Sequence, residues 1–227
     1  MTSRTEIVFL VDFDGTLYEG NSFHSWVRYV LWAGLSSARF RSRWQCRRAV
    51  MFSSLLRTLG FIDHAAWKRR VQLAWHLALP QVWQQESETV AFIEVLKKRI
   101  DYGLLKQIRA SRTPEPVRIL TTAAPAEYVE ALGCVLGFNK VIATPAGRSS
   151  DWIHNIGTKK FERTMDFMKK SGLAQHHLIL YTDHLDDRPL MESANEIHLV
   201  AVEEGKKMAA MLEEISRCGA EVFLHCR

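Results

Sequence analysis

The sequence is poor in the features that define several classes of protein. Its 227 residues include 4 cysteines and 6 prolines, which excludes a disulfide-stapled mini-fold, a collagen-like chain and low-complexity disorder. The longest charge-free stretches, such as Val71 to Gln85, are too short and too polar to cross a bilayer. The first apolar run, Ile7 to Val11, ends at an aspartate after five residues. We therefore expect no secretory signal and no integral membrane segment.

The cysteines are scattered, with no CxxC pair and no Cys/His spacing typical of a metal site; they are Cys46, Cys134, Cys218 and Cys226. Reduced thiols of structural character in a cytoplasmic enzyme are the natural interpretation.

Charge is unevenly distributed along the chain. The net charge is +5, but residues 18–113 hold 16 Lys+Arg against 6 Asp+Glu, a local balance of +10, which leaves −5 for the rest. A basic segment of this kind favours anionic ligands. A small phosphorylated substrate, an anionic membrane surface and RNA all qualify, and so does an ordinary solvated helix face.

Short apolar runs rich in β-branched residues alternate with helical patterns. The predicted strands are Ile7 to Val11, Val117 to Leu120, Val141 to Ala143, Leu178 to Tyr181 and Ile197 to Val202, with an edge strand at Val222 to His225. The predicted helices between them are Ala126 to Leu136, Phe161 to Lys170 and Lys206 to Arg217. This alternation predicts an α/β fold with a doubly wound parallel sheet.

An insert of about 95 residues separates the first two strands, far more than a crossover helix needs. It reads as helical throughout, over Phe23 to Leu35, Ala38 to Leu59, His64 to Leu77 and Gln81 to Lys98. We therefore predict a core of residues 1–17 plus 114–227 and a helical insert of residues 18–113. Six of the seven tryptophans lie in this insert and are expected to fill a small helical core, with one or two left to wall a pocket.

Two aspartates directly follow the first strand, in Asp12-Phe13-Asp14-Gly15-Thr16. Ligands of open α/β sheets bind just beyond the carboxyl ends of the strands, which is where this pair falls. Two carboxylates so close together need a cation, or one of them must take up a proton. Mg²⁺ meets that need, although Asp-Gly is also a common turn sequence.

Other strand ends carry suitable partners. Asp183 follows Leu178 to Tyr181 and can complete a metal site. Asp187 can orient metal-bound water or pair with a lysine. Capping of the next helix is an alternative role for these acids. Thr121 ends the second strand and can hydrogen-bond a phosphoryl oxygen. Lys159 and Lys160 stand at a helix N-terminus, where a cation opposes the helix dipole and therefore indicates an anionic partner.

These four segments, in this order, resemble the haloacid dehalogenase superfamily, and within it the phosphoserine-phosphatase-like branch. Asp12-x-Asp14-Gly15-Thr16 matches the first family motif, Thr121 the second, a lysine the third, and Asp183 with Asp187 the fourth. The alignment of Gly157 and Phe161 favours Lys160 over Lys159. The resemblance spans nearly the whole chain, and the insert is similar to that branch's helical cap.

The resemblance implies phosphoryl transfer through an aspartyl-phosphate. Asp12 would be the nucleophile, Asp14 the general acid and then base, and Thr121 and Lys160 would hold the transferring oxygens. Mg²⁺ would be bound by the side chains of Asp12 and Asp183 and the backbone carbonyl of Asp14. We expect hydrolysis of a small phosphorylated metabolite, with nucleic acid not the expected partner.

Two departures from the family pattern stand out. Thr182 and His184 flank Asp183 where the family has a glycine and often a serine. Asn21 stands where phosphoserine enzymes have a glutamate for the substrate amine, which argues against free phosphoserine. Two alternative functions stay open: a phosphotransferase with an alcohol acceptor, and a non-catalytic module whose basic cap docks on RNA or an anionic membrane.

Overall fold

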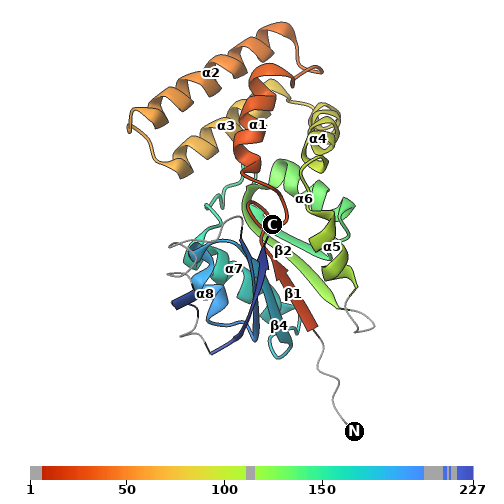
Figure 1. Cartoon of the computed structure of the whole chain (residues 1–227). Helices are drawn as coiled ribbons and strands as arrows, with labels where there is room; N and C mark the ends of the chain where they lie inside the picture. Colours follow the sequence, from red (N-terminus) through yellow and green to blue (C-terminus); the bar gives the residue numbers. More distant parts are fainter. Residues whose placement is uncertain (1–6, 111–115, 202–211, 214, 216–218, 227) are drawn as a thin grey trace.

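A computed structural model describes residues 7–110, 116–201, 212–213, 215 and 219–226. Within them, a six-stranded parallel sheet has the order β3-β2-β1-β4-β5-β6 (Figure 1). The strands are β1 (Ile7–Val11), β2 (Val117–Pro125), β3 (Lys140–Thr144), β4 (His177–Thr182), β5 (Glu196–Ala201) and β6 (Glu221–Cys226). The predicted doubly wound parallel sheet is confirmed, and the predicted edge strand pairs with β5.

Helices cover both faces of the sheet, because the side chains of the central strand alternate between two cores. Phe9 and Val11 belong to one core, which they share with α5 (Tyr102–Arg109) and α6 (Ala126–Val135). Val8 and Leu10 belong to the other, with α7 (Gly157–Lys170) and α8 (Arg188–Met191). A strand buried on both faces needs a continuous apolar run, which is what this one has.

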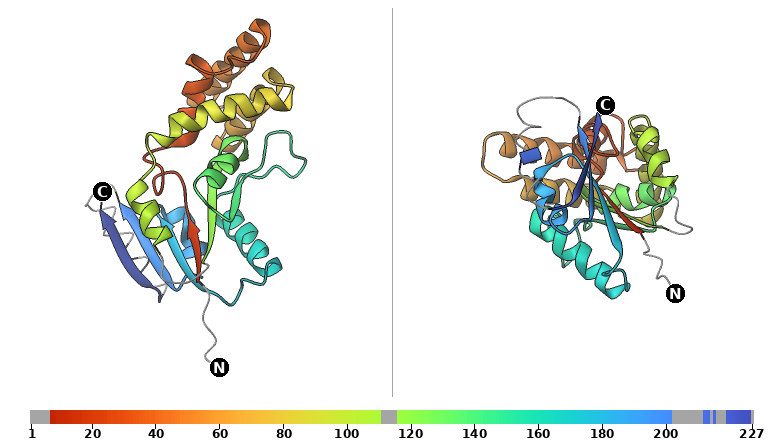
Figure 2. Two further views of the ribbon diagram at one scale, coloured as in Figure 1. Left: turned by 90° about the vertical axis from the view of Figure 1, so that its right-hand side faces the viewer. Right: turned by 60° about the horizontal axis from the view of Figure 1, so that its bottom comes forward.

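Four helices stand together at the carboxyl edge of the sheet (Figure 2). They are α1 (Ser22–Trp32), α2 (Phe40–Thr58), α3 (His64–Ala78) and α4 (Val82–Lys97), and we call them the cap helices. Each coincides with a predicted helix. The side chains of Asn21 and Asp63 start α1 and α3 by accepting hydrogen bonds from the free backbone N–H groups of the first turn.

The short helix α5 was not predicted, although Asp101 caps it by accepting from the backbone N–H of Leu104 at 2.8 Å. It lies beside the sheet rather than with the cap helices. Arg118 on β2 donates to the backbone carbonyls of Ile108 and Arg109, at 3.4 and 3.3 Å. The predicted boundary of the insert, residue 113, lies outside the described residues and stays a prediction.

The prediction that the insert's tryptophans fill its core is wrong for half of them. Trp26, Trp67 and Trp75 are buried, but Trp32, Trp44 and Trp83 are 81%, 54% and 62% exposed. None of the six lines the cavity described below. Helical spacing alone does not reveal which faces of a four-helix group find a partner.

The predicted helix from Lys206 to Arg217 falls largely outside the described residues. Among those that are described, no helix combines the length and the apolar character that crossing a bilayer requires.

Candidate active site

The parallel register brings Asp12 and Asp183 to neighbouring strand ends. Asp12 follows β1 and its backbone N–H donates to the carbonyl of Tyr181 on β4 at 2.9 Å, which continues the ladder. Asp183 follows β4 and accepts a hydrogen bond from the Thr16 hydroxyl at 3.1 Å. Gly15, with a φ of +82°, leaves the space that the carboxylate of Asp183 occupies. Any side chain at residue 15 would collide with that carboxylate.

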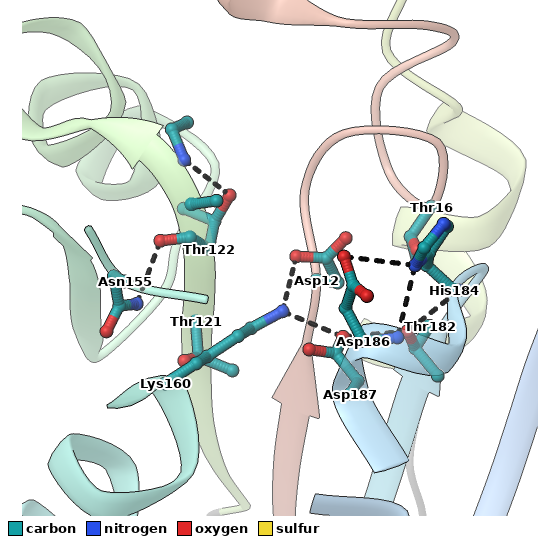
Figure 3. Close-up of polar contacts among 12 residues, drawn as sticks. Asp12, Thr16, Thr121, Thr122, Asn155, Lys160, Thr182, His184, Asp186 and Asp187 are labelled. Carbon is teal, nitrogen blue, oxygen red and sulfur yellow. Dashed lines mark hydrogen bonds and ion pairs between the residues drawn. The ribbon is translucent and has the colours of Figure 1, made fainter. Parts of the chain in front are cut away.

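Lys160 lies between two carboxylates at the centre of the site (Figure 3). Its Nζ donates to Oδ1 of Asp12 at 2.7 Å and to Oδ2 of Asp187 at 2.8 Å. Burial alone would lower the pKa of Lys160, but the two carboxylates outweigh burial and raise it. The lysine is therefore a fixed positive charge against Asp12 at every physiological pH.

Thr182, one departure from the family pattern, has a clear role here. Its hydroxyl donates to Oδ2 of Asp187 at 2.8 Å, so Asp187 is held from two sides. Of the two roles predicted for Asp187, the geometry shows the pairing with a lysine. Lys159 instead points outward, where it forms an exposed ion pair with Glu162 at 2.7 Å.

Asp14 has different surroundings from Asp12. Its Oδ1 accepts from the backbone N–H of Ser22 at 2.7 Å, and the Ser22 hydroxyl in turn contacts the hydroxyl of Tyr128 at 2.9 Å. Burial raises the pKa of Asp14 to about 6, against the opposing effect of the Ser22 hydrogen bond. A carboxyl group that titrates near neutrality suits the exchange of protons.

These groups line one cavity of about 350 Å³ between the sheet edge and the cap. Its charged lining consists of Asp12, Asp14, Asp183, Asp186, Asp187, Lys68 and Lys160. The other lining residues include Asn21, His64, Thr122, Ala123, His154, Asn155 and His184. Five carboxyl groups against two lysines leave an excess of negative charge, so a phosphate would be repelled unless a further cation were present.

The donor chemistry at this point suits Mg²⁺. Burial raises the pKa of Asp12, Asp14 and Asp183, and the charge of Asp183 adds to the rise at the other two. Carboxylate oxygens are the ligands this ion prefers, and its charge would favour the ionised forms of Asp12 and Asp183. Within the described residues, however, no three His, Cys, Asp or Glu side chains converge as a complete ligand set.

Thr121, the residue predicted for the second motif, does not line the cavity. Thr121 is fully buried, and its hydroxyl contacts that of Thr164 on α7 at 2.9 Å, outside the cavity lining. The next residue, Thr122, lines the cavity. Its backbone carbonyl accepts from the buried side chain of Asn155 at 2.9 Å, which fixes this strand end (Figure 3). Thr122 is therefore a second candidate, beside Thr121, for the hydroxyl that binds a phosphoryl oxygen.

A pair of substitutions tests this assignment. The Thr122 hydroxyl accepts from the backbone N–H of Ala124, and no other described group takes its proton. We expect Thr122→Val to lower kcat/KM for a phosphomonoester by about tenfold, the value of one lost hydrogen bond. Thr121→Val is the matched control and should cost about 1 kcal/mol of unfolding free energy with little change in kcat/KM. Steady-state kinetics and urea unfolding of both variants decide which threonine hydroxyl binds the phosphoryl group. The opposite pattern would assign that role to Thr121.

A cap residue that the sequence analysis missed also enters the cavity. Lys68 on α3 is 3% exposed; its Nζ donates to the carbonyl of Ala123 at 2.7 Å and lies 3.0 Å from Nε2 of His154. Burial lowers the pKa of Lys68 to about 8, opposed by the charge of Asp14. Burial also lowers the pKa of His154 to about 3, so the ring is neutral and can accept from the lysine.

The same face of α3 is fastened to the core by buried hydrogen bonds. Gln72 Nε2 donates to Oε2 of Glu127 at 2.7 Å, and His76 Nε2 lies 3.0 Å from Oε1 of that carboxylate. Lys68, Gln72 and His76 recur at every fourth position and therefore share one helix face. That spacing of polar residues was visible in the sequence and was the signal that could have identified this contact.

Comparison with known proteins agrees with this architecture. The model of the haloacid dehalogenase-like hydrolases matches residues 9–192. The chain therefore belongs to this family. Membership of this family indicates a hydrolase.

The similar solved structures share the fold at low identity. A protein of unknown function from Bordetella pertussis Tohama I is 16% identical with a TM-score of 0.74, over 97% of this chain and 99% of that one. A phosphoserine phosphatase solved as a phospho-aspartyl intermediate analogue is 12% identical with a TM-score of 0.53, over 97% and 94%. A phosphoserine phosphohydrolase-like protein from Francisella tularensis is 15% identical with a TM-score of 0.50, over 95% and 94%. No curated protein matches the sequence.

Proposed function

We propose that the protein hydrolyses a small phosphomonoester in the presence of Mg²⁺, through an aspartyl-phosphate on Asp12. The observation that carries this proposal is the difference between two carboxyl groups of one cavity. Asp12 is held by the ammonium of Lys160, whereas Asp14 is held by the backbone N–H of Ser22. Groups whose environments differ in this way can act separately as nucleophile and as acid.

In the first step, an Asp12 carboxylate oxygen attacks phosphorus, the P–O bond to the alcohol breaks, and Asp14 gives its proton to the leaving oxygen. In the second, Asp14 takes a proton from water, the water oxygen attacks phosphorus, and the bond to Asp12 breaks to release inorganic phosphate. Reversal of one group from acid to base is usual in two-step hydrolysis. Lys160 and the hydroxyl of Thr122 would hold the phosphoryl oxygens.

Mg²⁺ would be held by the carboxylates of Asp12 and Asp183 and the carbonyl of Asp14, and when bound it would offset the charge between nucleophile and phosphate.

The protein resembles phosphoserine enzymes, but it lacks their charged residue for the amine of the substrate. Asn21 lines the cavity without a charge, and its side chain is engaged in capping α1 by accepting from the backbone N–H of His24 at 2.9 Å. We place the enzyme in the cytoplasm, in keeping with the free thiols of Cys46 and Cys134.

The direct test is phosphate release. We expect the purified protein to hydrolyse p-nitrophenyl phosphate and members of a panel of phosphorylated metabolites with Mg²⁺, and to lose that activity in EDTA and regain it when Mg²⁺ is returned. Addition of an alcohol acceptor distinguishes a phosphotransferase, because a new ester would then form at the expense of free phosphate. Absence of release from every substrate with Mg²⁺ present would contradict the proposal.

Lys68 gives the proposal a specific kinetic signature. Its ammonium is the cap's positive charge in the cavity, so Lys68→Met should raise KM by about 10- to 100-fold, as expected for a lost charged hydrogen bond. Because the pKa of Lys68 is about 8, wild-type KM should rise as the pH passes 8 and the ammonium loses its proton. In Lys68→Arg that rise should vanish, since a guanidinium stays charged. Arg69→Met, on an exposed position of the same helix, is the control and should leave KM unchanged.

A further inference from the structure

Helix α2 carries an exposed apolar face that the catalytic site does not use. Figure 1 places it at the end of the cap farthest from the sheet. The exposed side chains on this face, here called the α2 stripe, are Phe40, Trp44, Met51, Phe52, Leu55 and Leu59. They are between 52% and 80% exposed. At 3.6 residues per turn they fall within about 120° of the helix circumference, so they form one continuous face.

The positive charge around the stripe is not balanced by any carboxylate nearby in the sequence. Residues 21–62 contain seven arginines and neither aspartate nor glutamate. Arg41 and Arg48 are exposed and fall on the stripe's side of the helix, and the Arg48 guanidinium stacks over the Trp44 ring at 4.5 Å. Within the described part of the chain, no acid forms an ion pair with either of them.

Two further arginines of the segment are engaged in the fold. Arg43 donates to the carbonyls of Ser36 and Ala38, at 3.1 and 3.3 Å, and Arg47 donates to those of Val30 and Gly34, at 3.2 and 3.3 Å. Their partners are neutral carbonyls, so their charge adds to the field of this face. The result is an apolar stripe on a chain segment with an excess of positive charge.

We propose that the α2 stripe docks the enzyme on a membrane surface rich in anionic phospholipid. The aliphatic and aromatic side chains would enter the boundary between headgroups and acyl chains, while Arg41 and Arg48 would contact the lipid phosphates. This combination of apolar and basic side chains on one exposed helix is the physical requirement for binding in the plane of a membrane. The proposal does not depend on the proposed function, because binding requires no turnover.

Two other occupants fit the face less well. RNA would pair with the arginines, but the aliphatic side chains of Met51, Leu55 and Leu59 offer nothing to a phosphate backbone or to stacked bases. A second copy in a two-fold dimer would bring one acid-free basic segment against another, and this repulsion would have to be overcome. An anionic bilayer satisfies both the apolar and the positive component.

Sedimentation with vesicles tests the proposal. We expect binding to vesicles of phosphatidylcholine mixed with phosphatidylglycerol, and much weaker binding to pure phosphatidylcholine. Each arginine near such a surface is worth about a fivefold change in partitioning, so Arg41→Gln/Arg48→Gln should weaken binding about 25-fold. Phe52→Ser/Leu55→Ser should also abolish most of it. A blue shift of tryptophan emission on binding should disappear in Trp44→Phe.

The control is Trp83→Ser/Val90→Ser on α4. These side chains are 62% and 61% exposed, but their helix carries Glu86 and Glu94, so vesicle binding should be unchanged. Equal binding to both vesicle types, binding to neither, or wild-type binding by both α2 double variants would overturn the proposal. So would a dimer that is lost in Phe52→Ser/Leu55→Ser without vesicle binding, or steeply salt-dependent RNA binding without it.

Discussion

Asp12→Asn is expected to reduce phosphate release by a factor on the order of 10³ or more, since the removal of a covalent nucleophile eliminates the reaction path rather than weakening one contact. The fold should survive. Asp12 lies beyond the end of β1, and in the variant Lys160 keeps its ion pair with Asp187 at 2.8 Å. The measurements are single-turnover and steady-state phosphate release, with circular dichroism to verify the fold.

Asp186→Asn is the matched control for this substitution. Asp186 lines the same cavity but is exposed, and its carboxylate contacts His184 at 3.3 Å rather than a lysine. It should retain most of the wild-type activity. Because an asparagine can revert to aspartate by deamidation, Asp12→Ala is measured alongside. Substantial turnover in Asp12→Ala would contradict the covalent mechanism.

Lys160→Met is expected to lose both activity and stability. The substitution leaves the carboxylates of Asp12 and Asp187 buried without their ammonium partner, and breaking a buried ion pair in this way costs about 3–5 kcal/mol. Urea unfolding measures that loss, and phosphate release measures the loss of activity. Lys159→Met is the matched control: its ion pair is exposed and worth about 0–1 kcal/mol, so neither property should change much.

A double variant separates the two effects of Lys160. In Lys160→Met/Asp187→Asn one of the two stranded carboxylates becomes neutral, so part of the unfolding free energy should return. Activity should not return, because the positive charge beside Asp12 is still missing. If activity recovered together with stability, the lysine would have a structural role alone.

The sequence predicts the sheet, which is confirmed, and it also predicts acids that the structure brings to one cavity. Each of Asp12, Asp183 and Asp187 follows a strand whose buried face is plain from its apolar run, and parallel register then brings such residues to one edge. The choice of Lys160 over Lys159 was also predicted, and the structure pairs Lys160 with Asp12. The apolar runs and the residues that directly follow them were enough for these predictions.

What could not be predicted depends on the direction in which side chains point. Thr121 and Thr122 are neighbours at one strand end, and only the orientation of the strand decides which hydroxyl reaches the cavity. Lys68 lies far from every motif in the sequence, and it reaches the site through the packing of α3 on the core. Likewise, Trp44 could be assigned to a core or to a surface only once the neighbours of α2 were known.

The arrangement of α3 links access to the cavity with its charge. The buried hydrogen bonds from Gln72 and His76 to Glu127 and the Lys68 ammonium in the cavity belong to one rigid helix. Lifting that helix to admit a molecule would break the hydrogen bonds to Glu127 and withdraw the ammonium in a single movement. Opening the cavity by this movement would therefore remove the Lys68 ammonium from the binding site, and closing it would bring that charge back against a bound anion.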